Sequence, residues 1–180
     1  MGNNEIDISK KYSYVDYEKW EDRWELIDGT PYVKSPEPVY GHQRIATRLS
    51  GEFYFQLKNS PIYTVCQPLN YKIADDTVLQ PDMLIICGDV GYNQLYLNFP
   101  PLLVAEVLSP STALRDRNTK FKIYQTQGVR YYLILSPDNK EVEIYELENS
   151  RYVLKAKGNE IQYEFDLPGC NATIDFRQVW

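Results

Sequence analysis

The chain is poor in the residues from which several kinds of site are built. It has one histidine, His42, and three widely spaced cysteines among 180 residues. No cysteine or histidine pair has the spacing of zinc ligands, which argues against a conventional structural zinc site. The odd number of cysteines predicts reduced, buried thiols in place of a disulfide framework, and with them a cytoplasmic location.

Long apolar runs are also missing. No run approaches the roughly 18 residues that a membrane-spanning helix needs. The first residues do not form a basic segment followed by an apolar one, so we expect no secretory signal. With 43% hydrophobic and 24% charged residues, the composition predicts a soluble globular protein that makes no contact with a membrane.

Positive charge is scarce overall but locally concentrated. The formal net charge of −6 argues against a protein that coats nucleic acid through bulk electrostatics. Residues 112–130, however, hold five basic residues and a single acidic one, Asp116. Such a segment is either a basic face for a polyanionic substrate or an ordinary solvated helix face, and charge pattern alone does not decide between them.

The length and the periodicity predict the organisation of the chain. We expect a flexible N-terminus over residues 1–11 and a single domain over residues 12–180. The helices are expected at 13–20, at 41–57 after the breakers Pro36 and Pro38, and from 111 or 112 to the C-cap Gly128. The strands are expected in a hairpin at 24–33 and at 62–66, 69–73, 81–87, 102–108, 129–135, 141–147 and 151–156. Residues 88–101 are expected to form a loop that could overhang a site, and residues 172–176 a short apolar segment.

Two carboxylates interrupt the most apolar strands. The runs 81–87 and 102–108 lack alternation, as in strands covered on both faces, and they carry Asp82 at the head of the first and Glu106 near the end of the second. If these strands pair, the carboxylates converge on a rigid support. Phosphodiester cleavage by a metal needs a few fixed oxygen ligands and open positions for a water and a phosphate oxygen.

Such a site also needs a cation to orient the water or to meet the charge that develops on the phosphate. In nucleases of the PD-(D/E)XK pattern a lysine stands two residues after the second acid, but that position here is Leu108. Lys120 is the candidate substitute, because Asp116, Lys120 and Tyr124 are spaced four apart and form one stripe on the following helix. A helix that folds back on the sheet can bring this stripe near the strand ends.

Together these residues resemble the Uma-two family of restriction-endonuclease-like proteins, within the PD-(D/E)XK nuclease superfamily. The resemblance extends from the first helix to the strand at 141–147. It rests on Glu25-Leu26-Ile27-Asp28-Gly29, His42, Gln80-Pro81-Asp82, the segment 104–112, Arg115-Asp116, Lys120, Tyr124, Gly128-Val129 and Tyr131-Tyr132-Leu133-Ile134. The chain departs from the family at 130–132, where Arg-Tyr-Tyr replaces an acid followed by Tyr-Trp, and we expect this change to affect packing.

The resemblance implies an α/β (α+β) fold of the restriction-endonuclease kind, with a mixed central β-sheet flanked by helices and an antiparallel C-terminal extension. It assigns Asp82 and Glu106 as metal ligands, Glu25 as a third acid at the metal, and Lys120 as the displaced catalytic lysine. The implied cofactor is Mg²⁺, with Mn²⁺ as a substitute. The implied substrate is DNA, and the implied working form is a homodimer.

Four more residues are expected to support this site. His42 stands at the start of the long helix, Gln80 precedes Asp82 by two residues, and Asp116 and Tyr124 flank Lys120 on its stripe. A lone histidine at a helix start is, however, more often a cap or a packing residue. Gln80 can equally serve only to position its strand.

The central residues also have ordinary structural interpretations. Asp82 and Glu106 could cap loops or pair with arginines of the next helix, and Lys120 could be a surface lysine paired with Asp116. Three hypotheses about function follow. The first is a metal-dependent DNA endonuclease, the second a fold relative that binds nucleic acid or protein without cleaving it, and the third a metal-dependent hydrolase of another phosphate ester.

Overall fold

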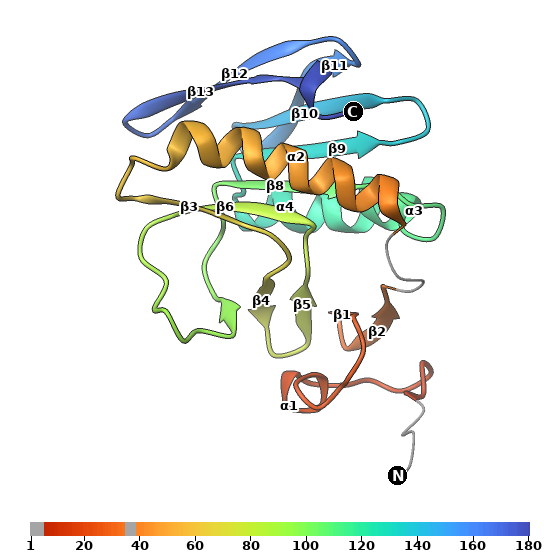
Figure 1. Cartoon of the computed structure of the whole chain (residues 1–180). Coiled ribbons are helices and arrows are strands. Elements are labelled where there is room, and N and C mark those ends of the chain that lie inside the picture. The colour runs from red at the N-terminus through yellow and green to blue at the C-terminus, as the bar shows by residue number, and fades with distance from the viewer. Residues whose placement is uncertain (1–5, 35–38) are drawn as a thin grey trace.

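A six-stranded sheet lies at the centre of the molecule (Figure 1). The structure, a computed structural model, describes residues 6–34 and 39–180. The strand order of the sheet is β11-β10-β9-β8-β6-β3, and β8 and β9 run parallel while the other neighbours are antiparallel. Its strands are β3 (Tyr63–Cys66), β6 (Met83–Cys87), β8 (Leu103–Val107), β9 (Tyr131–Ser136), β10 (Glu141–Glu148) and β11 (Arg151–Gly158). The antiparallel run β9 to β11 confirms the predicted C-terminal extension.

One face of this sheet is covered by the long helix α2 (Tyr40–Leu57). The predicted stripe of apolar residues every four positions is confirmed, because all four of its members are buried in one core cluster with inward residues of β6 and β8. They are Ile45, Leu49, Phe53 and Leu57. A C-terminal hairpin continues the layer that α2 forms on this face of the sheet. It consists of β12 (Gln162–Leu167) and β13 (Cys170–Asp175) and is followed by a 3₁₀ turn at Phe176–Gln178.

A second, five-stranded sheet packs near the other face, with the order β2-β1-β5-β4-β7. Its strands are β1 (Trp24–Ile27), β2 (Thr30–Val33), β4 (Asn70–Ala74), β5 (Thr77–Leu79) and β7 (Tyr96–Leu97). The predicted β1–β2 hairpin is confirmed, and its turn residues Asp28 and Gly29 have φ of 49° and 73°, as a two-residue type I′ turn requires. The sequence predicted one mixed sheet, whereas residues 6–34 and 39–180 form two mixed sheets and the two-stranded β12–β13 hairpin.

The helix predicted after β8 is present, but it contains both α-helical and π-helical turns. It consists of α3 (Ala113–Arg115), a π-helical segment (Asp116–Lys120) and α4 (Phe121–Gln127), and Gly128 ends it with φ 81°. A π-helical turn holds one more residue than an α-helical turn and often occurs at functional sites. Tyr124 of α4 packs on the face of the six-stranded sheet opposite α2.

Some local predictions were wrong. The short helix α1 (Tyr14–Tyr17) stops three residues before the predicted end. The strands β5, β7 and β12 were not predicted, since each lies in a stretch dominated by turn residues or by polar side chains. The three cysteines are free, as predicted, but they are only half-buried.

Two further expectations concern segments at the edge of the described structure. Residues 1–5 of the expected flexible N-terminus, and the breakers Pro36 and Pro38, lie outside the described residues. Within the described part, Lys10 N–H donates to Asp7 C=O in a turn, and the Lys11 ammonium donates to Asp28 C=O at 2.6 Å.

No helix in residues 6–34 and 39–180 is long and apolar enough to cross a membrane.

Candidate active site

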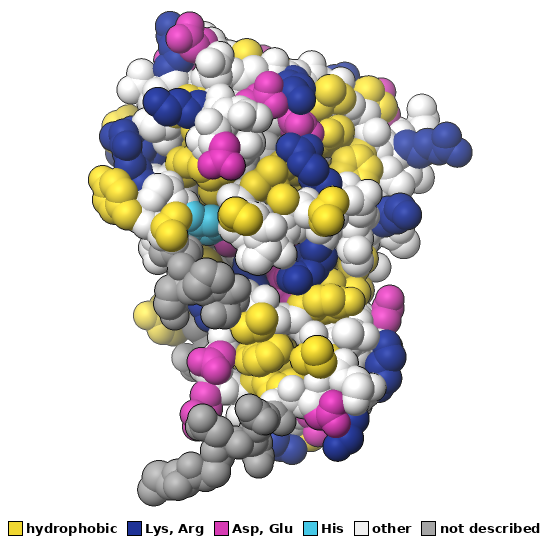
Figure 2. Space-filling model, turned by 90° about the vertical axis from the view of Figure 1, so that its right-hand side faces the viewer, with side chains coloured by type: hydrophobic (Ala, Val, Ile, Leu, Met, Phe, Trp, Pro, Cys, Tyr) yellow, Lys and Arg dark blue, Asp and Glu magenta, His cyan; other side chains and the backbone are white. Residues whose placement is uncertain are grey.

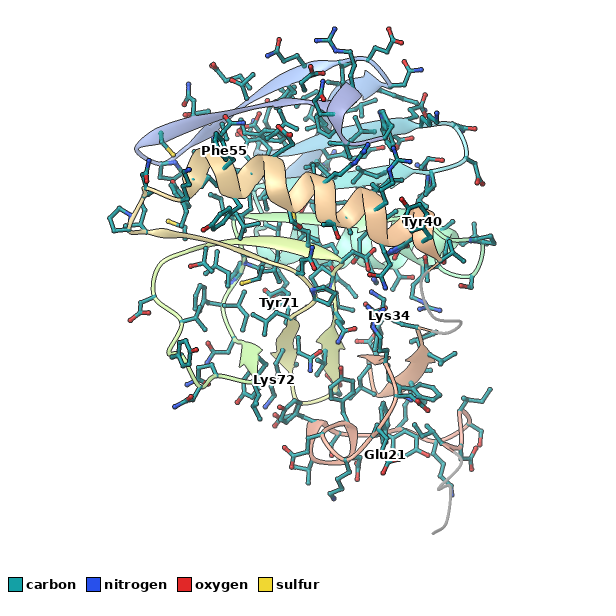
Figure 3. All side chains as sticks on the ribbon, in the orientation of Figure 1. Glu21, Lys34, Tyr40, Phe55, Tyr71 and Lys72 are labelled. Atoms are coloured by element: carbon teal, nitrogen blue, oxygen red, sulfur yellow. The ribbon has the colours of Figure 1, made fainter. Side chains whose placement is uncertain are left out.

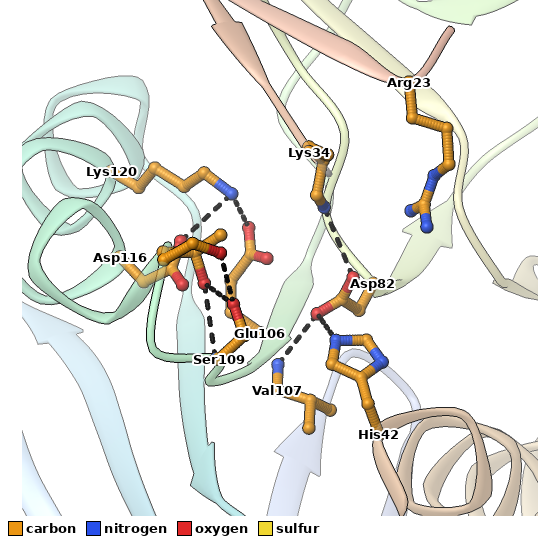
Figure 4. A pocket seen from close by; sticks show the side chains of 11 residues that line it. Arg23, Lys34, His42, Asp82, Glu106, Val107, Ser109, Asp116 and Lys120 are labelled. Carbon is orange, nitrogen blue, oxygen red and sulfur yellow. Dashed lines mark hydrogen bonds and ion pairs between the residues drawn. The ribbon is translucent and has the colours of Figure 1, made fainter. Parts of the chain in front are cut away.

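Asp82 and Glu106 lie side by side at one end of the central strands. In the antiparallel pair of β6 and β8, Met83 is opposite Ala105, so the next residues in register are Asp82 and Glu106. Both line a cavity of about 40 Å³ (Figure 4). This volume admits an ion or a few water molecules. The predicted pairing of the strands, and the predicted convergence of the two carboxylates, are therefore both present.

Lys120 lies in the same pocket at the centre of three carboxylates. Its ammonium Nζ is 2.7 Å from Glu25 Oε1, 2.8 Å from Glu106 Oε1 and 3.1 Å from Asp116 Oδ1. We call these four residues the Lys120 cluster. The lysine is fully buried, so its interpretation as a surface lysine is wrong, although its pairing with Asp116 is present.

The helix after β8 presents one side to this cluster. Asp116 and Lys120 begin and end the π-helical segment, and Tyr124 follows on α4. The Tyr124 hydroxyl donates a 2.8 Å hydrogen bond to Glu106 Oε1, and the Tyr132 hydroxyl donates to Asp116 C=O at 3.0 Å. The predicted stripe therefore faces the strand ends as a unit.

The cluster holds more acid than base, and the pKa values of its members reflect that imbalance. Burial lowers the pKa of Lys120, but the carboxylates of Glu106, Glu25 and Asp116 outweigh it and hold the pKa well above its usual range. Burial raises the pKa of Glu106, with Asp116 and Asp82 adding to the effect and Lys120 opposing it. The pKa of Glu25 is lowered, since Lys120 and the Gln80 N–H outweigh the effect of burial. Glu106 is thus the acid of the cluster whose charged form is least stabilised, and its pKa is raised to about 8.

Asp82 has three partners of its own. Its Oδ2 lies 3.1 Å from His42 Nε2 and accepts a 2.9 Å hydrogen bond from the Val107 N–H. Its Oδ1 lies 3.3 Å from the Lys34 ammonium. Burial raises the pKa of Asp82, but Lys34 and the hydrogen bond with His42 outweigh it and bring the pKa well below its usual range. Asp82 is therefore a carboxylate at neutral pH.

His42 is placed by the first turn of α2, which starts next to the pocket. Figure 2 shows this residue, the single histidine, at the surface beside a hollow in the face that the view presents. Its side chain is 14% exposed. The histidine thus connects the long helix to Asp82.

Glu25 and Gln80 lie behind the pocket. Glu25 is fully buried on β1 and is absent from the residues that line the cavity. Its Oε1 accepts a 3.0 Å hydrogen bond from the Gln80 N–H, and its Oε2 lies 3.6 Å from Arg115 Nη1. The Gln80 side chain accepts a 3.0 Å hydrogen bond from Arg23 Nε. Both residues hold charged neighbours in place.

The sequence did not single out two cations of the pocket, Arg23 and Lys34. They flank the β1–β2 hairpin, and the pairing of Trp24 with Val33 places them next in register. A signal existed, because continuing the predicted hairpin by one residue on each side sets the two cations across from each other. Hydroxyl side chains of Ser109, Ser111 and Thr112, at the entry to α3, also line the cavity. No residue of the 88–101 loop does.

The donor set can be tested against a divalent ion. In residues 6–34 and 39–180, no three Asp, Glu, His or Cys side chains form a group that could hold a metal. Mg²⁺, however, keeps several waters and commonly takes only one or two protein carboxylates. Asp82 and Glu106 supply two, and Glu106 Oε2 has no hydrogen bond or ion pair within the described part of the chain. The pocket therefore fits a hydrated Mg²⁺ held by two carboxylates.

A mixed sheet flanked by helices, with two acids at adjacent strand ends and a lysine beside them, defines a protein of the restriction-endonuclease-like class. The chain belongs to the Uma2 family, described as "Putative restriction endonuclease", whose model matches residues 14–175.

Two further comparisons found similar proteins. An "uncharacterized protein slr1290" of Synechocystis sp. is 30% identical over 141 residues, which are 75% of this chain and 74% of that protein. A crystal structure of "a putative nuclease belonging to DUF820" from Anabaena variabilis is similar in fold, with a TM-score of 0.74 at 16% identity. The match covers 93% of this chain and 96% of the other, so the fold is shared over nearly its whole length.

Proposed function

We propose that the protein is a metal-dependent nuclease that hydrolyses phosphodiester bonds of DNA, with Mg²⁺ as its ion and Mn²⁺ as a substitute. One observation carries the proposal: Asp82, Glu106 and Lys120 meet in one pocket, with the lysine 2.8 Å from Glu106. The family description supports the same class of reaction. A bound divalent ion supplies a Lewis acid and lowers the pKa of a water.

The residues of the chain would divide the remaining work. Asp82 and Glu106 would hold the ion, the first fixed by His42 and the Val107 N–H, and the second fixed through its Oε1 by Lys120 and Tyr124. These contacts leave Glu106 Oε2 for the ion.

Lys120 would orient the attacking water and stabilise negative charge that develops on the phosphate. Glu25 and Asp116 keep this lysine charged. Because Glu25 does not line the cavity, we assign it to the support of Lys120, and any contact with the ion would run through water.

Cleavage of supercoiled plasmid in Mg²⁺ tests the proposal. We expect nicking by the wild-type protein and its loss in Asp82→Asn, Glu106→Gln and Lys120→Met. Matched controls are the exposed Asp89, at the far end of β6, and the exposed Lys122, two residues after Lys120. Asp89→Asn and Lys122→Met should cleave like the wild type, whereas equal activity in the three pocket variants would overturn the proposal.

A second candidate function is that of a binding module that does not cleave. It is favoured by the contacts of Asp82, whose oxygens are both engaged by protein groups, one of them a lysine. Calorimetric titration with Mg²⁺ or Mn²⁺ discriminates between the two. Heat that disappears in Asp82→Asn and Glu106→Gln favours the nuclease, and a titration without heat favours the binding module.

A homodimer belongs to the proposal as well. Cutting both strands of a duplex requires two sites, and two copies related by a two-fold axis would provide them. Light scattering coupled to gel filtration measures the mass directly. A monomer that still linearises plasmid would separate this part of the proposal from the catalytic part.

A further inference from the structure

The open end of the β1–β2 hairpin carries two cations. Arg23 and Lys34 are cross-strand neighbours, and the Lys34 N–H donates a 2.8 Å hydrogen bond to Arg23 C=O. Both side chains line the pocket (Figure 4), on the Asp82 side and away from Asp116. Figure 3 shows Lys34 between the hairpin and the six-stranded sheet. The hairpin therefore adds a positive side to a pocket whose acids come from the other sheet and from the π-helical segment.

Arg23 has no counter-charge among the described residues. Its Nε donates to the neutral Gln80 side chain at 3.0 Å, and its Nη2 is buried without a hydrogen-bond partner. No carboxylate lies within ion-pair distance of it in residues 6–34 and 39–180, whereas Arg115, Arg117 and Arg130 each face one. A partly buried cation without a counter-charge is costly unless a ligand provides the charge. The position of Arg23 is thus suited to an anion.

Lys34 is held by two contacts, and Asp82 does not depend on this lysine alone. Its side chain is 7% exposed and contacts Gln80 C=O and Asp82 Oδ1. Asp82 keeps two other partners, His42 and the Val107 N–H, on its Oδ2. The lysine contact can therefore be exchanged for a contact with a bound anion.

We propose that Arg23 and Lys34 form an anion clamp that takes the non-bridging oxygens of one backbone phosphate of DNA. The choice of DNA rests on the proposed function. Arginine matches a phosphate with two parallel N–H groups, whereas lysine acts as a movable point charge. The clamp would hold the phosphate at the pocket, opposite Lys120. It would so position the phosphate next to the carboxylates of Asp82 and Glu106.

The salt dependence of DNA binding tests the clamp without any metal. A fluorescein-labelled duplex is titrated with protein in EDTA at several salt concentrations, and binding is followed by fluorescence anisotropy. Each phosphate contact contributes about 1 to the slope of log K against log salt. We expect the double variant Arg23→Gln/Lys34→Met to reduce the slope by about 1, because the two cations share one phosphate, and each single variant to reduce it by part of that amount.

Charge-matched variants distinguish the clamp from a general loss of positive charge or of folding. Arg151→Gln and Lys19→Met remove exposed cations at the start of β11 and just after α1, and their slopes should equal that of the wild type. Arg23→Lys and Lys34→Arg keep the charges, so their slopes should be retained even if the binding constant weakens. Thermal melts establish that each variant is folded.

The outcomes separate this inference from the proposed nuclease activity. A wild type that binds DNA with the expected slope changes, but cleaves nothing in Mg²⁺, supports the clamp and overturns the nuclease. A wild type that cleaves, with folded Arg23→Gln and Lys34→Met proteins whose slopes are unchanged, overturns the clamp alone. No measurable binding by the wild type at low salt also overturns it.

Discussion

The π-helical segment contributes side chains to two clusters of charge that differ in burial and in how well their charges are matched. On one side, the Lys120 cluster sets one lysine among three carboxylates. On the other, Glu143 of β10 accepts hydrogen bonds from Arg117 at 2.8 Å, from Tyr145 at 2.7 Å and from Lys157 at 3.2 Å. We call this second group the Glu143 cluster. It has one acid and three donors, and it lies outside the pocket.

The charges of the Glu143 cluster stabilise the fold, whereas charge in the Lys120 cluster is available to a ligand. Both oxygens of Glu143 accept hydrogen bonds, whereas Glu25 Oε2 and Asp116 Oδ1 of the Lys120 cluster are buried with no hydrogen bond and with one ion-pair contact each, to Arg115 at 3.6 Å and to Lys120 at 3.1 Å. A buried polar atom without a partner costs free energy of folding. The Lys120 cluster therefore bears a cost that the Glu143 cluster avoids, and a cation in the pocket would relieve it.

The largest expected effect comes from removing the lysine. In Lys120→Met three buried carboxylates lose their cation, and breaking a buried ion pair in this way costs about 3–5 kcal/mol of unfolding free energy. Chemical denaturation at neutral pH measures the loss, with Lys122→Met as the control that should change stability by less than about 0.5 kcal/mol. The variant should also gain stability as the pH falls, since its acids are then protonated. A Lys120→Met protein as stable as the wild type would contradict the distinction between the two clusters.

A smaller loss is expected from the matched cluster. Glu143→Gln removes the charge that Arg117 and Lys157 neutralise. Charge-assisted hydrogen bonds contribute about 1.5–3 kcal/mol, but both cations are more than a third exposed, so solvent screening reduces the expected loss to about 1–2 kcal/mol. Plasmid cleavage and Mg²⁺ binding should remain those of the wild type, because Glu143 lies outside the pocket. Reduced cleavage by a folded Glu143→Gln protein would mean that the two clusters are not independent.

The pH dependence of stability provides a second test of how the Glu143 cluster stabilises the fold. Burial raises the pKa of Glu143, but the hydrogen bonds from Arg117, Tyr145 and Lys157 outweigh it and lower the pKa from 4.5 to about 2. A lowered pKa in the folded state means that the carboxylate stabilises the fold above pH 4.5 and that this contribution disappears as the pH falls towards 2. The difference in unfolding free energy between wild type and Glu143→Gln should shrink over this range, and a constant difference would contradict the assignment.

The smallest expected change in stability is that of Glu106→Gln. This substitution removes one negative charge from a cluster with an excess of them, so the lost ion pair is largely offset, and we expect a change within about 1 kcal/mol. The same variant should bind no Mg²⁺ by calorimetry. Glu106→Gln should therefore cost less stability than Glu143→Gln but more function, and the reverse order would remove the distinction between the clusters.

The sequence was sufficient to predict the elements that have long patterns. The unbroken runs of β6 and β8 and the stripe of α2 each repeat one signal over several residues, so these two strands and the long helix were predicted to within two residues at each end. Short elements were not. The three residues of β5 and the two of β7 are too few to carry a periodicity, and their place in a second sheet depends on partners far away in the sequence.

The residues of the candidate site likewise differ in how strongly the sequence marks them. Asp82, Glu106 and Lys120 could be singled out because charged residues within or after apolar runs are rare and need partners. Lys34 and Arg23 carry a weaker signal, because a basic residue at the end of a short hairpin is ordinary and only their cross-strand position sets them apart. What makes them part of the pocket is the packing of the hairpin against the head of β6, and that is a tertiary property.

The π-helical turn at 116–120 has a consequence for the evolution of the family. A π-helical turn is an α-helical turn with one inserted residue, so relatives with one residue fewer here would have a continuous α-helix. Each residue of an α-helix turns by about 100°, and such a deletion would rotate Lys120 away from Glu106 relative to the start of the helix. We expect single-residue length differences at this turn to mark lineages in which the lysine has moved or has been lost.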